Sequence, residues 1–216
     1  MAEINLLRSL PKQRRVISDR AKTKTADHIR ISGEFGELYF DGPREYGYGG
    51  YYYDGRWKSV ARDIVNQYHL QPGDKVLDIG CAKGFLVKDL VGIGIDAVGI
   101  DVSEYALKNS VDGIDGRLEL GDATTLKFQD KSFDLALSFN TIHNLDRAGC
   151  VEALSEMMRV APHNGFVQVD SYRNEKQRSL FNDWVLTAKF HDYPEGWLVL
   201  FHESGYTGDW WWTIVE

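Results

Sequence analysis

An acid followed by three small residues at alternate positions is the pattern in this sequence with the clearest chemical meaning. Asp78 ends an apolar run, and Gly80, Ala82 and Gly84 follow before a new apolar stretch begins at Phe85. The pattern predicts a buried strand, a tight turn and the start of a helix. Because the turn is built from small residues, a ligand can rest directly on its backbone. We therefore expect a ligand-binding turn at this point of the chain.

Charge and spacing decide which kind of ligand suits the turn. A dinucleotide fingerprint needs Gly-x-Gly-x-x-Gly, with the pyrophosphate over the helix N-terminus. Read from Gly80, the third glycine position is occupied by Phe85, which does not permit the close packing of helix on strand that a glycine allows. The Asp78 carboxylate would repel a pyrophosphate and attract an ammonium or a sulfonium. The turn therefore favours a ligand with positive charge beside an adenosine over NAD.

The turn resembles the first motif of class I methyltransferases that use S-adenosylmethionine, with Ala82 in place of the central glycine. Three later segments resemble further motifs of that family, in the same order. One β-rich run ends at Asp101, roughly 20 residues after the first acid, where a carboxylate accepts hydrogen bonds from both ribose hydroxyls. Asp122 follows the third predicted strand, where the family places an acid facing the adenine amino group, and Asn140 ends the fourth, beside the transferring methyl.

The resemblance covers roughly residues 57–170 and implies S-adenosylmethionine as the cofactor. Val102 is expected to pack on the adenine face. The two cysteines of the chain show no metal-ligand spacing, so no metal is expected. The residues expected to bind the cofactor are Asp78, Gly80, Cys81, Ala82, Gly84, Asp101, Val102, Asp122, Ala123 and Asn140, together with Tyr48 and Arg56 from a preceding segment.

That preceding segment, residues 46–57, is rich in glycine and tyrosine. In the family, the region before the first core helix commonly closes over cofactor and substrate. Tyrosine faces attract a sulfonium or a cationic amine by roughly 0.5–2 kcal/mol each, and Arg56 suits a methionine carboxylate or a substrate anion. We predict a lid, with Tyr48 and Tyr51 as its ligand contacts. The alternative is an ordered surface loop whose tyrosines pack on the domain.

His143, after the fourth predicted strand, is the best-placed titratable group for the chemistry. Methyl transfer mainly requires alignment of the nucleophile and exclusion of water, but a hydroxyl or ammonium nucleophile must also lose a proton. We predict His143 as the catalytic base, and the alternative is a histidine that only packs or hydrogen-bonds at a helix start. Asp170, after the fifth strand, is a further candidate substrate contact. The residues expected to bind the substrate are Tyr51, His143, Asn144, Tyr172 and Arg173; for the last two, a capped helix start on the rim is the alternative.

The elements that position these residues begin with a helix predicted from apolar spacing over residues 57–68. Strand and helix then alternate up to about residue 172, with the fifth strand predicted at residues 165–171. The alternation predicts an α/β fold, a three-layer Rossmann-like sandwich with a mostly parallel sheet and right-handed crossovers. Residues 1–56 are expected to form an arm and lid, and residues 57–216 the methyltransferase domain. The family's usual seventh strand has no counterpart after residues 209–215, so the sheet has six strands or takes a seventh from upstream. The Trp210–Trp212 run is predicted to cover the sheet, and an exposed face there would predict a homodimer.

Composition narrows the function. An apolar share of 43% is enough for a full core. A net charge of −7 argues against a nucleic-acid or membrane-surface binder, and the basic residues before residue 30 are expected to be solvated. With no membrane span, no signal peptide and two unpaired cysteines, the sequence predicts a cytoplasmic protein. We predict a methyltransferase acting at N or O of a small polar metabolite or a sugar- or nucleotide-linked intermediate. The alternatives are a non-catalytic S-adenosylmethionine-binding regulator and an NAD-dependent reductase.

Overall fold

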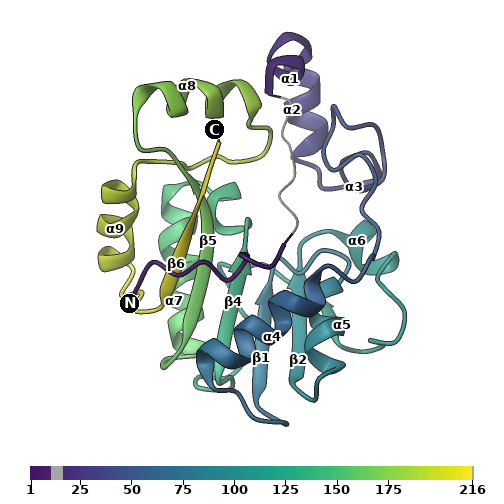
Figure 1. The fold of residues 1–216 in the computed structure, drawn as a ribbon, viewed down its shortest axis with the longest axis vertical. Helices are drawn as coiled ribbons and strands as arrows, with labels where there is room; N and C mark the ends of the chain where they lie inside the picture. Colours follow the sequence, from purple (N-terminus) through teal and green to yellow (C-terminus); the bar gives the residue numbers. More distant parts are fainter. Residues whose placement is uncertain (11–16, 216) are drawn as a thin grey trace.

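The computed structural model describes residues 1–10 and 17–215 of the chain. A six-stranded sheet forms its centre, in the order β3-β2-β1-β4-β5-β6, and every neighbouring pair is parallel. Helices cover both faces, which gives the predicted three-layer arrangement (Figure 1). The strands are β1 Lys75–Ile79, β2 Asp96–Asp101, β3 Leu118–Leu120, β4 Leu135–Phe139, β5 Gly165–Ser171 and β6 Asp209–Ile214.

The central strands are apolar along most of their length because both of their faces are buried. All seven residues of β5 are buried, as are four of the five in β1. A parallel sheet covered by helices on two sides produces this pattern in place of strict alternation. The strand order reverses direction between β1 and β4. In open sheets of this kind the ligand crevice lies at that switch point, beyond the carboxyl ends of the strands.

Two pairs of helices form the outer layers. The helices α4 (Trp57–Tyr68) and α5 (Phe85–Val91) cover one face, and α7 (Arg147–Val160) and α9 (Pro194–Glu203) cover the other. The helix α4 begins and ends where its apolar spacing predicts, and Val60, Ala61 and Ile64 on its inner side are fully buried.

The segment of residues 17–56 folds over the carboxyl ends of the strands (Figure 1). It contains α1 (Ile17–Thr23), α2 (Ala26–Ser32) and α3 (Glu37–Phe40), and α1 packs against α8 (Glu175–Trp184). Arg20 and Lys24 donate hydrogen bonds to the Trp184 and Val185 carbonyls, so the expectation of solvated charge is wrong for these two residues. The prediction also covered Lys12, Arg14 and Arg15, which lie outside the described residues.

Within residues 1–10 and 17–215 the sheet has six strands, which is the first of the two predicted alternatives. Upstream residues contribute only an isolated bridge beside β6, where the Ile4 N–H donates to the Trp210 carbonyl at 2.8 Å. Trp210 and Trp212 pack against Phe201 of α9, and Trp211 packs against the opposite core. Each face of β6 therefore packs on a core, with Trp212 buried and Trp210 and Trp211 half-buried, and the homodimer stays a prediction. Within the described ranges, no helix combines the length and apolar character needed to cross a membrane.

Candidate active site

Alternate residues of the cofactor loop, residues 78–85, adopt backbone conformations that favour glycine. The φ angles of Gly80, Ala82 and Gly84 are 80°, 50° and 75°. A side chain at Gly80 would overlap Thr141, and one at Gly84 would meet Ile114. A left-handed conformation costs a residue with a side chain about 1–2 kcal/mol, so Ala82 is held in a strained position. The spacing of small residues thus reflects a backbone that winds closely past its neighbours.

The loop is fastened to the neighbouring strand β2. The Gly80 and Cys81 N–H groups both donate to the Ile100 carbonyl, at 2.8 and 3.0 Å. Cys81 is buried, and a side chain at Gly99 would collide with it. Burial raises the pKa of the Cys81 thiol well above its ordinary value, so the thiol stays protonated and acts as a packing group.

Asp101, at the end of β2, is oriented toward the loop. Its two carboxylate oxygens accept hydrogen bonds from the Ala82 N–H at 2.7 Å and the Ser103 N–H at 2.8 Å. A carboxylate has about four acceptor positions, so two remain for a pair of hydroxyls. Burial raises the pKa of Asp101, while these backbone donors lower it. The arrangement fits a ribose diol.

Asp78 is buried beside Asp101 and has no compensating charge. It is 4% exposed, and no described residue donates a hydrogen bond to its carboxylate. Burial, and then the charge of Asp101, raise the pKa of Asp78 to about 7. A cationic ligand group would stabilise the ionised form. The donor set therefore fits a molecule that joins a ribose to an ammonium or a sulfonium, as S-adenosylmethionine does.

The predicted adenine contacts lie on loops after β2 and β3. Val102 is 55% exposed, so its side chain is accessible to the adenine ring that it is predicted to contact. Asp122 is exposed and accepts hydrogen bonds from the backbone N–H and hydroxyl of Thr124, both at 2.8 Å. Ala123 is buried beneath it. The Asp122 carboxylate keeps its second oxygen free of hydrogen bonds to described residues.

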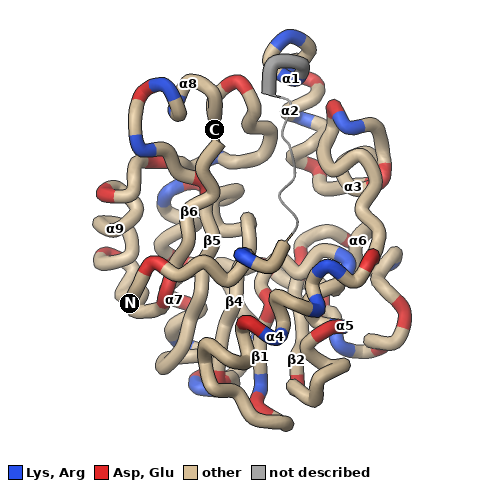
Figure 2. The backbone as a smooth tube through the Cα atoms, viewed as in Figure 1, with Lys and Arg blue, Asp and Glu red and all other residues tan. Residues whose placement is uncertain are grey.

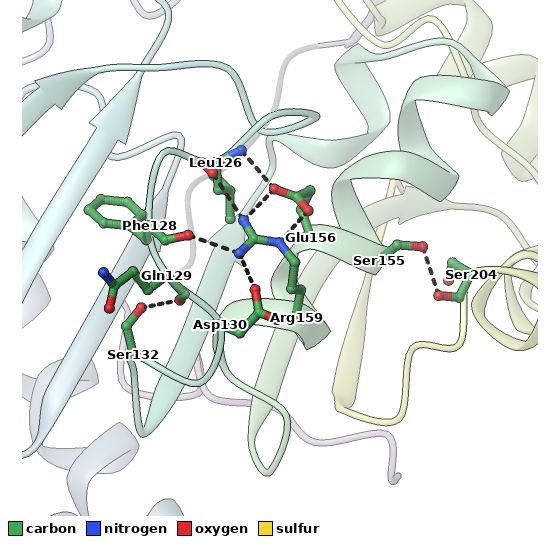
Figure 3. A network of polar contacts seen from close by, with 9 residues as sticks. All are labelled: Leu126, Phe128, Gln129, Asp130, Ser132, Ser155, Glu156, Arg159 and Ser204. Carbon is green, nitrogen blue, oxygen red and sulfur yellow. Dashed lines mark hydrogen bonds and ion pairs between the residues drawn. The ribbon is translucent and has the colours of Figure 1, made fainter.

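A polar network holds the chain that follows Asp122 (Figure 3). The Arg159 guanidinium, on α7, donates to the Phe128 and Leu126 carbonyls at 2.8 and 3.0 Å, and to the Asp130 carboxylate at 2.8 Å. Glu156 accepts from Arg159 and from the Leu126 N–H at 2.8 Å. One side chain thus fixes three positions of the loop, which limits how far the adenine side of the site can move.

The tyrosines of the predicted lid pack over the cofactor loop. Tyr51 stacks on Phe85, with ring centroids 4.7 Å apart and planes 13° apart, and Tyr48 lies 4.4 Å from Tyr51. Burial raises the pKa of Tyr51 well above its ordinary value, and Tyr48 and Asp78 raise it further. The segment is therefore ordered against the domain, at the place where a lid would act. Arg56 pairs with Asp54 within the segment, and no described contact directs it to the loop.

His143 is buried, and one of its nitrogens is already engaged. Its Nδ1 accepts the Asp170 N–H at 3.0 Å, and its Nε2 lies 3.4 Å from the Asp170 carboxylate. Burial lowers the pKa of His143, and Asp170 opposes that effect. The imidazole is therefore neutral with its proton on Nε2. Neutrality suits a base, but Nδ1 accepts a substrate proton only if its bond to Asp170 opens.

Asn140, which directly follows β4, is linked by hydrogen bonds to Thr213 and, through Thr213, to Gln168. Asn140 has a φ of 53°, and its side-chain oxygen accepts the Thr213 hydroxyl at 3.1 Å. The Gln168 amide donates in turn to Thr213 at 2.7 Å. Asn144 donates to the Asn140 carbonyl at 3.3 Å, and its buried side-chain oxygen has no partner among the described residues. Asn140 is exposed, and no hydrogen bond from its amide NH₂ to a described residue is seen.

The last two predicted substrate residues lie elsewhere. Tyr172 is 3% exposed and packs in an apolar cluster with Phe181 under α8. Arg173 pairs with Glu3 at 3.1 Å. The helix α8 begins directly after them, with Asn174 accepting the Gln177 N–H at 3.0 Å. Both positions favour the alternative of a capped helix start on the rim.

Three residues that contact the site region were not predicted from the sequence. Asp41, Lys83 and Tyr105 join the lid, the cofactor loop and α6 (Glu104–Lys108). Lys83 stands inside the small-residue pattern, where its charge offered a signal. Asp41 belongs to no pattern, because its partners are distant in sequence.

Comparison with known proteins places this site in a family. A family model described as a methyltransferase domain matches residues 77–169. A demethylmenaquinone methyltransferase of Symbiobacterium thermophilum is 31% identical over 121 residues, which cover 51% of this chain and 47% of that protein. The cycloartenol-C-24-methyltransferase 1 of Oryza sativa subsp. japonica is 28% identical over 134 residues, covering 53% and 39%. The chain spans about half the length, or less, of these curated relatives.

Solved structures show the same fold. A SAM-dependent methyltransferase from Methanosarcina mazei superposes with a TM-score of 0.52 at 20% identity, covering 65% of this chain and 82% of that one. Residues 77–169 therefore form the methyltransferase domain that the family model describes, and the fold is that of an S-adenosylmethionine-dependent methyltransferase. The cofactor of that family is S-adenosylmethionine, which is also the molecule that Asp78 and Asp101 fit.

Proposed function

We propose that this protein transfers a methyl group from S-adenosylmethionine to a nitrogen or oxygen atom of a small polar acceptor, a metabolite or a sugar- or nucleotide-linked intermediate. The pair of acids at the ends of adjacent strands, the buried Asp78 and the half-buried Asp101, carries the proposal. Bound S-adenosylmethionine supplies a methyl carbon that its sulfonium already activates. The protein then has to hold the donor, align the acceptor and exclude water.

On the donor side, we assign each residue a role from its charge and its position. Asp101 accepts the ribose hydroxyls through its two free acceptor positions, and Asp78 faces the positive end of the cofactor. Val102 packs on the adenine, and Asp122 accepts from its amino group. Tyr51 of the lid covers the loop and keeps water away, which strengthens every charge interaction beneath it.

The acceptor side favours an amine, or a hydroxyl compound with cationic character. Asp170 contributes a buried acid near the end of β5. The basic side chains nearest the lid already have partners, since Lys83 bonds to Asp41 and Arg56 to Asp54. Lys and Arg are interspersed with Asp and Glu along the chain (Figure 2), which supports a small molecule over a nucleic acid. We also propose His143 as the base, acting after its Nδ1 is released from Asp170.

The names of the relatives support a shared donor and different acceptors. They mention demethylmenaquinone, cycloartenol and, for an Arabidopsis thaliana protein 33% identical over 91 residues, phosphoethanolamine. The family model that matches this chain covers residues 77–169, which contain the donor loop and end before the last helices. The acceptor of this protein is therefore to be found by experiment.

Release of S-adenosylhomocysteine tests the proposal. The protein is incubated with S-adenosylmethionine and a panel of primary amines, alcohols, sugar nucleotides and carboxylates, and S-adenosylhomocysteine is quantified. We expect release with at least one amine or hydroxyl compound, and a matching methylated product by mass spectrometry. The Asp170→Asn variant should lower the preference for cationic members of the panel. Donor binding without release across the panel would instead support a non-catalytic regulator.

A further inference from the structure

The Asp41 carboxylate links the lid to the cofactor loop through hydrogen bonds. It directly follows α3, and its Oδ2 accepts hydrogen bonds from the Lys83 Nζ at 2.6 Å and the Tyr105 hydroxyl at 2.7 Å. Its Oδ1 accepts the Tyr51 N–H at 3.2 Å. One carboxylate thus binds a residue of the cofactor loop, a residue of α6 and the backbone of the lid.

Lys83 depends on this carboxylate. It lies between Ala82 and Gly84 in the loop, and its side chain is 9% exposed. Among the described residues, Asp41 is the acceptor of its ammonium, which also lies 5.8 Å from the centroid of the Tyr105 ring. A buried ammonium without a partner is costly. Separation of the lid from the loop would leave Lys83 in that state unless water or a ligand reached it.

The same carboxylate positions the aromatic part of the lid. Tyr51, whose backbone it holds, stacks on Phe85 and shares a small apolar cluster with Phe40 and Ala82. Burial alone would raise the pKa of Asp41, but the hydrogen bonds from Lys83 and Tyr105 outweigh burial and lower it. The carboxylate is therefore ionised at neutral pH, when it pairs with the ammonium.

We propose that Asp41, Lys83 and Tyr105 form a latch that keeps the lid closed over the cofactor loop, with Asp41 as a positioning residue. Asp41 acts through Lys83 and Tyr51 and does not touch the reacting atoms. Because the lid lies over Asp78 and Asp101, a bound cofactor leaves only when the latch parts. The part that concerns cofactor release rests on the proposed function, whereas lid closure does not.

The Asp41→Asn variant tests the latch because it keeps the shape of the side chain and removes its charge. In the protein without cofactor, hydrogen exchange in residues 36–53 should become at least tenfold faster, while exchange in β1 and β5 stays unchanged. Release of S-adenosylhomocysteine, followed by stopped-flow fluorescence, should become at least fivefold faster. The matched control is Glu104→Gln, which removes a charge from an exposed pair with Lys108 on α6 and should change neither measurement.

Two further variants test the latch from the side of its other two residues. Lys83→Met should match Asp41→Asn, and the double variant should be no worse than either single one, because both remove the same interaction. Tyr105→Phe removes one hydroxyl from the surface of α6 and should speed lid exchange about two- to threefold, even if the Asp41 variant does not fold.

Unchanged lid exchange in Asp41→Asn would overturn the latch. Tighter binding of S-adenosylhomocysteine by that variant would also overturn it, because the contact would then be excluding the cofactor. If the wild-type protein binds no S-adenosylhomocysteine, the proposed function fails, while the exchange measurement still decides whether the latch exists.

Discussion

The donor and acceptor halves of the site differ in how many of their polar groups are already satisfied. On the donor side, Asp78 has no hydrogen bond from a described residue and Asp101 keeps two acceptor positions free. On the acceptor side, His143 accepts the Asp170 N–H through its Nδ1, and its Nε2 lies 3.4 Å from the Asp170 carboxylate. An unpaired buried acid such as Asp78 indicates that the ligand carries positive charge, whereas a hydrogen-bonded pair such as His143 and Asp170 gives less information about its ligand.

The match to the family model also bears on the difference between the donor and acceptor halves. The family model covers residues 77–169, which include the donor loop, Asp101 and Asp122 and also the proposed base His143, but not the lid or Asp170. We therefore infer that the shared part binds the donor, and that the lid and the segment after β5 contribute to the choice of acceptor.

The largest expected effect is in the donor half, at Gly80. In Gly80→Ala, the new methyl overlaps Thr141 and the residue is held at a φ of 80°. We expect binding of S-adenosylhomocysteine to weaken by more than about a hundredfold, because strain and overlap add. Calorimetry measures the affinity. The control is Gly116→Ala, which has a φ of 72° but open space around it, and which should leave the affinity within twofold.

The next largest effect is expected in the acceptor half, at His143, where turnover and cofactor affinity should respond differently. In His143→Ala we expect turnover to fall by about a hundredfold, the lower range for general-base catalysis, with cofactor affinity within twofold. Because burial lowers the pKa of His143, turnover should be flat above pH 7 and fall only at more acidic pH. Single-turnover rates across pH give this profile. Unchanged turnover in the variant would remove His143 as the base and leave it a packing residue.

A smaller effect is expected from pH on donor binding. Asp78 has a pKa of about 7 in the free protein, and a cationic ligand binds its ionised form. Affinity for S-adenosylmethionine should therefore rise about tenfold between pH 6 and pH 8. In Asp78→Asn the dependence should disappear. The sign for stability is the reverse: the raised pKa of this acid favours the folded state at low pH, and that contribution is lost as the pH rises toward 7.

The sequence predicted the donor half well because its chemistry is local along the chain. The acid at the strand end and the three small residues that follow it lie within seven positions of the sequence. Each of these residues reflects a charge or a backbone angle at its own position. The bounds of α4 and β5 were also predicted, because burial repeats at helical spacing in one and is continuous in the other.

The contacts that were not predicted join distant parts of the chain. Lys83 meets Asp41 across 42 positions, and His143 meets Asp170 across 27. No periodicity encodes such pairs, since they depend on how loops pack once the sheet has formed. Tyr172 shows the same limit: its place at a strand end suggested the crevice, but the packing of α8 buries it.

The most direct test of the account is a calorimetric titration of S-adenosylhomocysteine and NAD into the wild-type protein, Asp101→Ala and Asp96→Ala. Asp96 lies at the opposite end of the same strand, in a partly exposed pair with Arg117, and serves as the control. We predict that S-adenosylhomocysteine binds one to one, that Asp101→Ala weakens it at least tenfold, that Asp96→Ala leaves it unchanged, and that NAD does not bind. Binding of NAD, or equal affinity in Asp101→Ala and the wild type, would contradict the account.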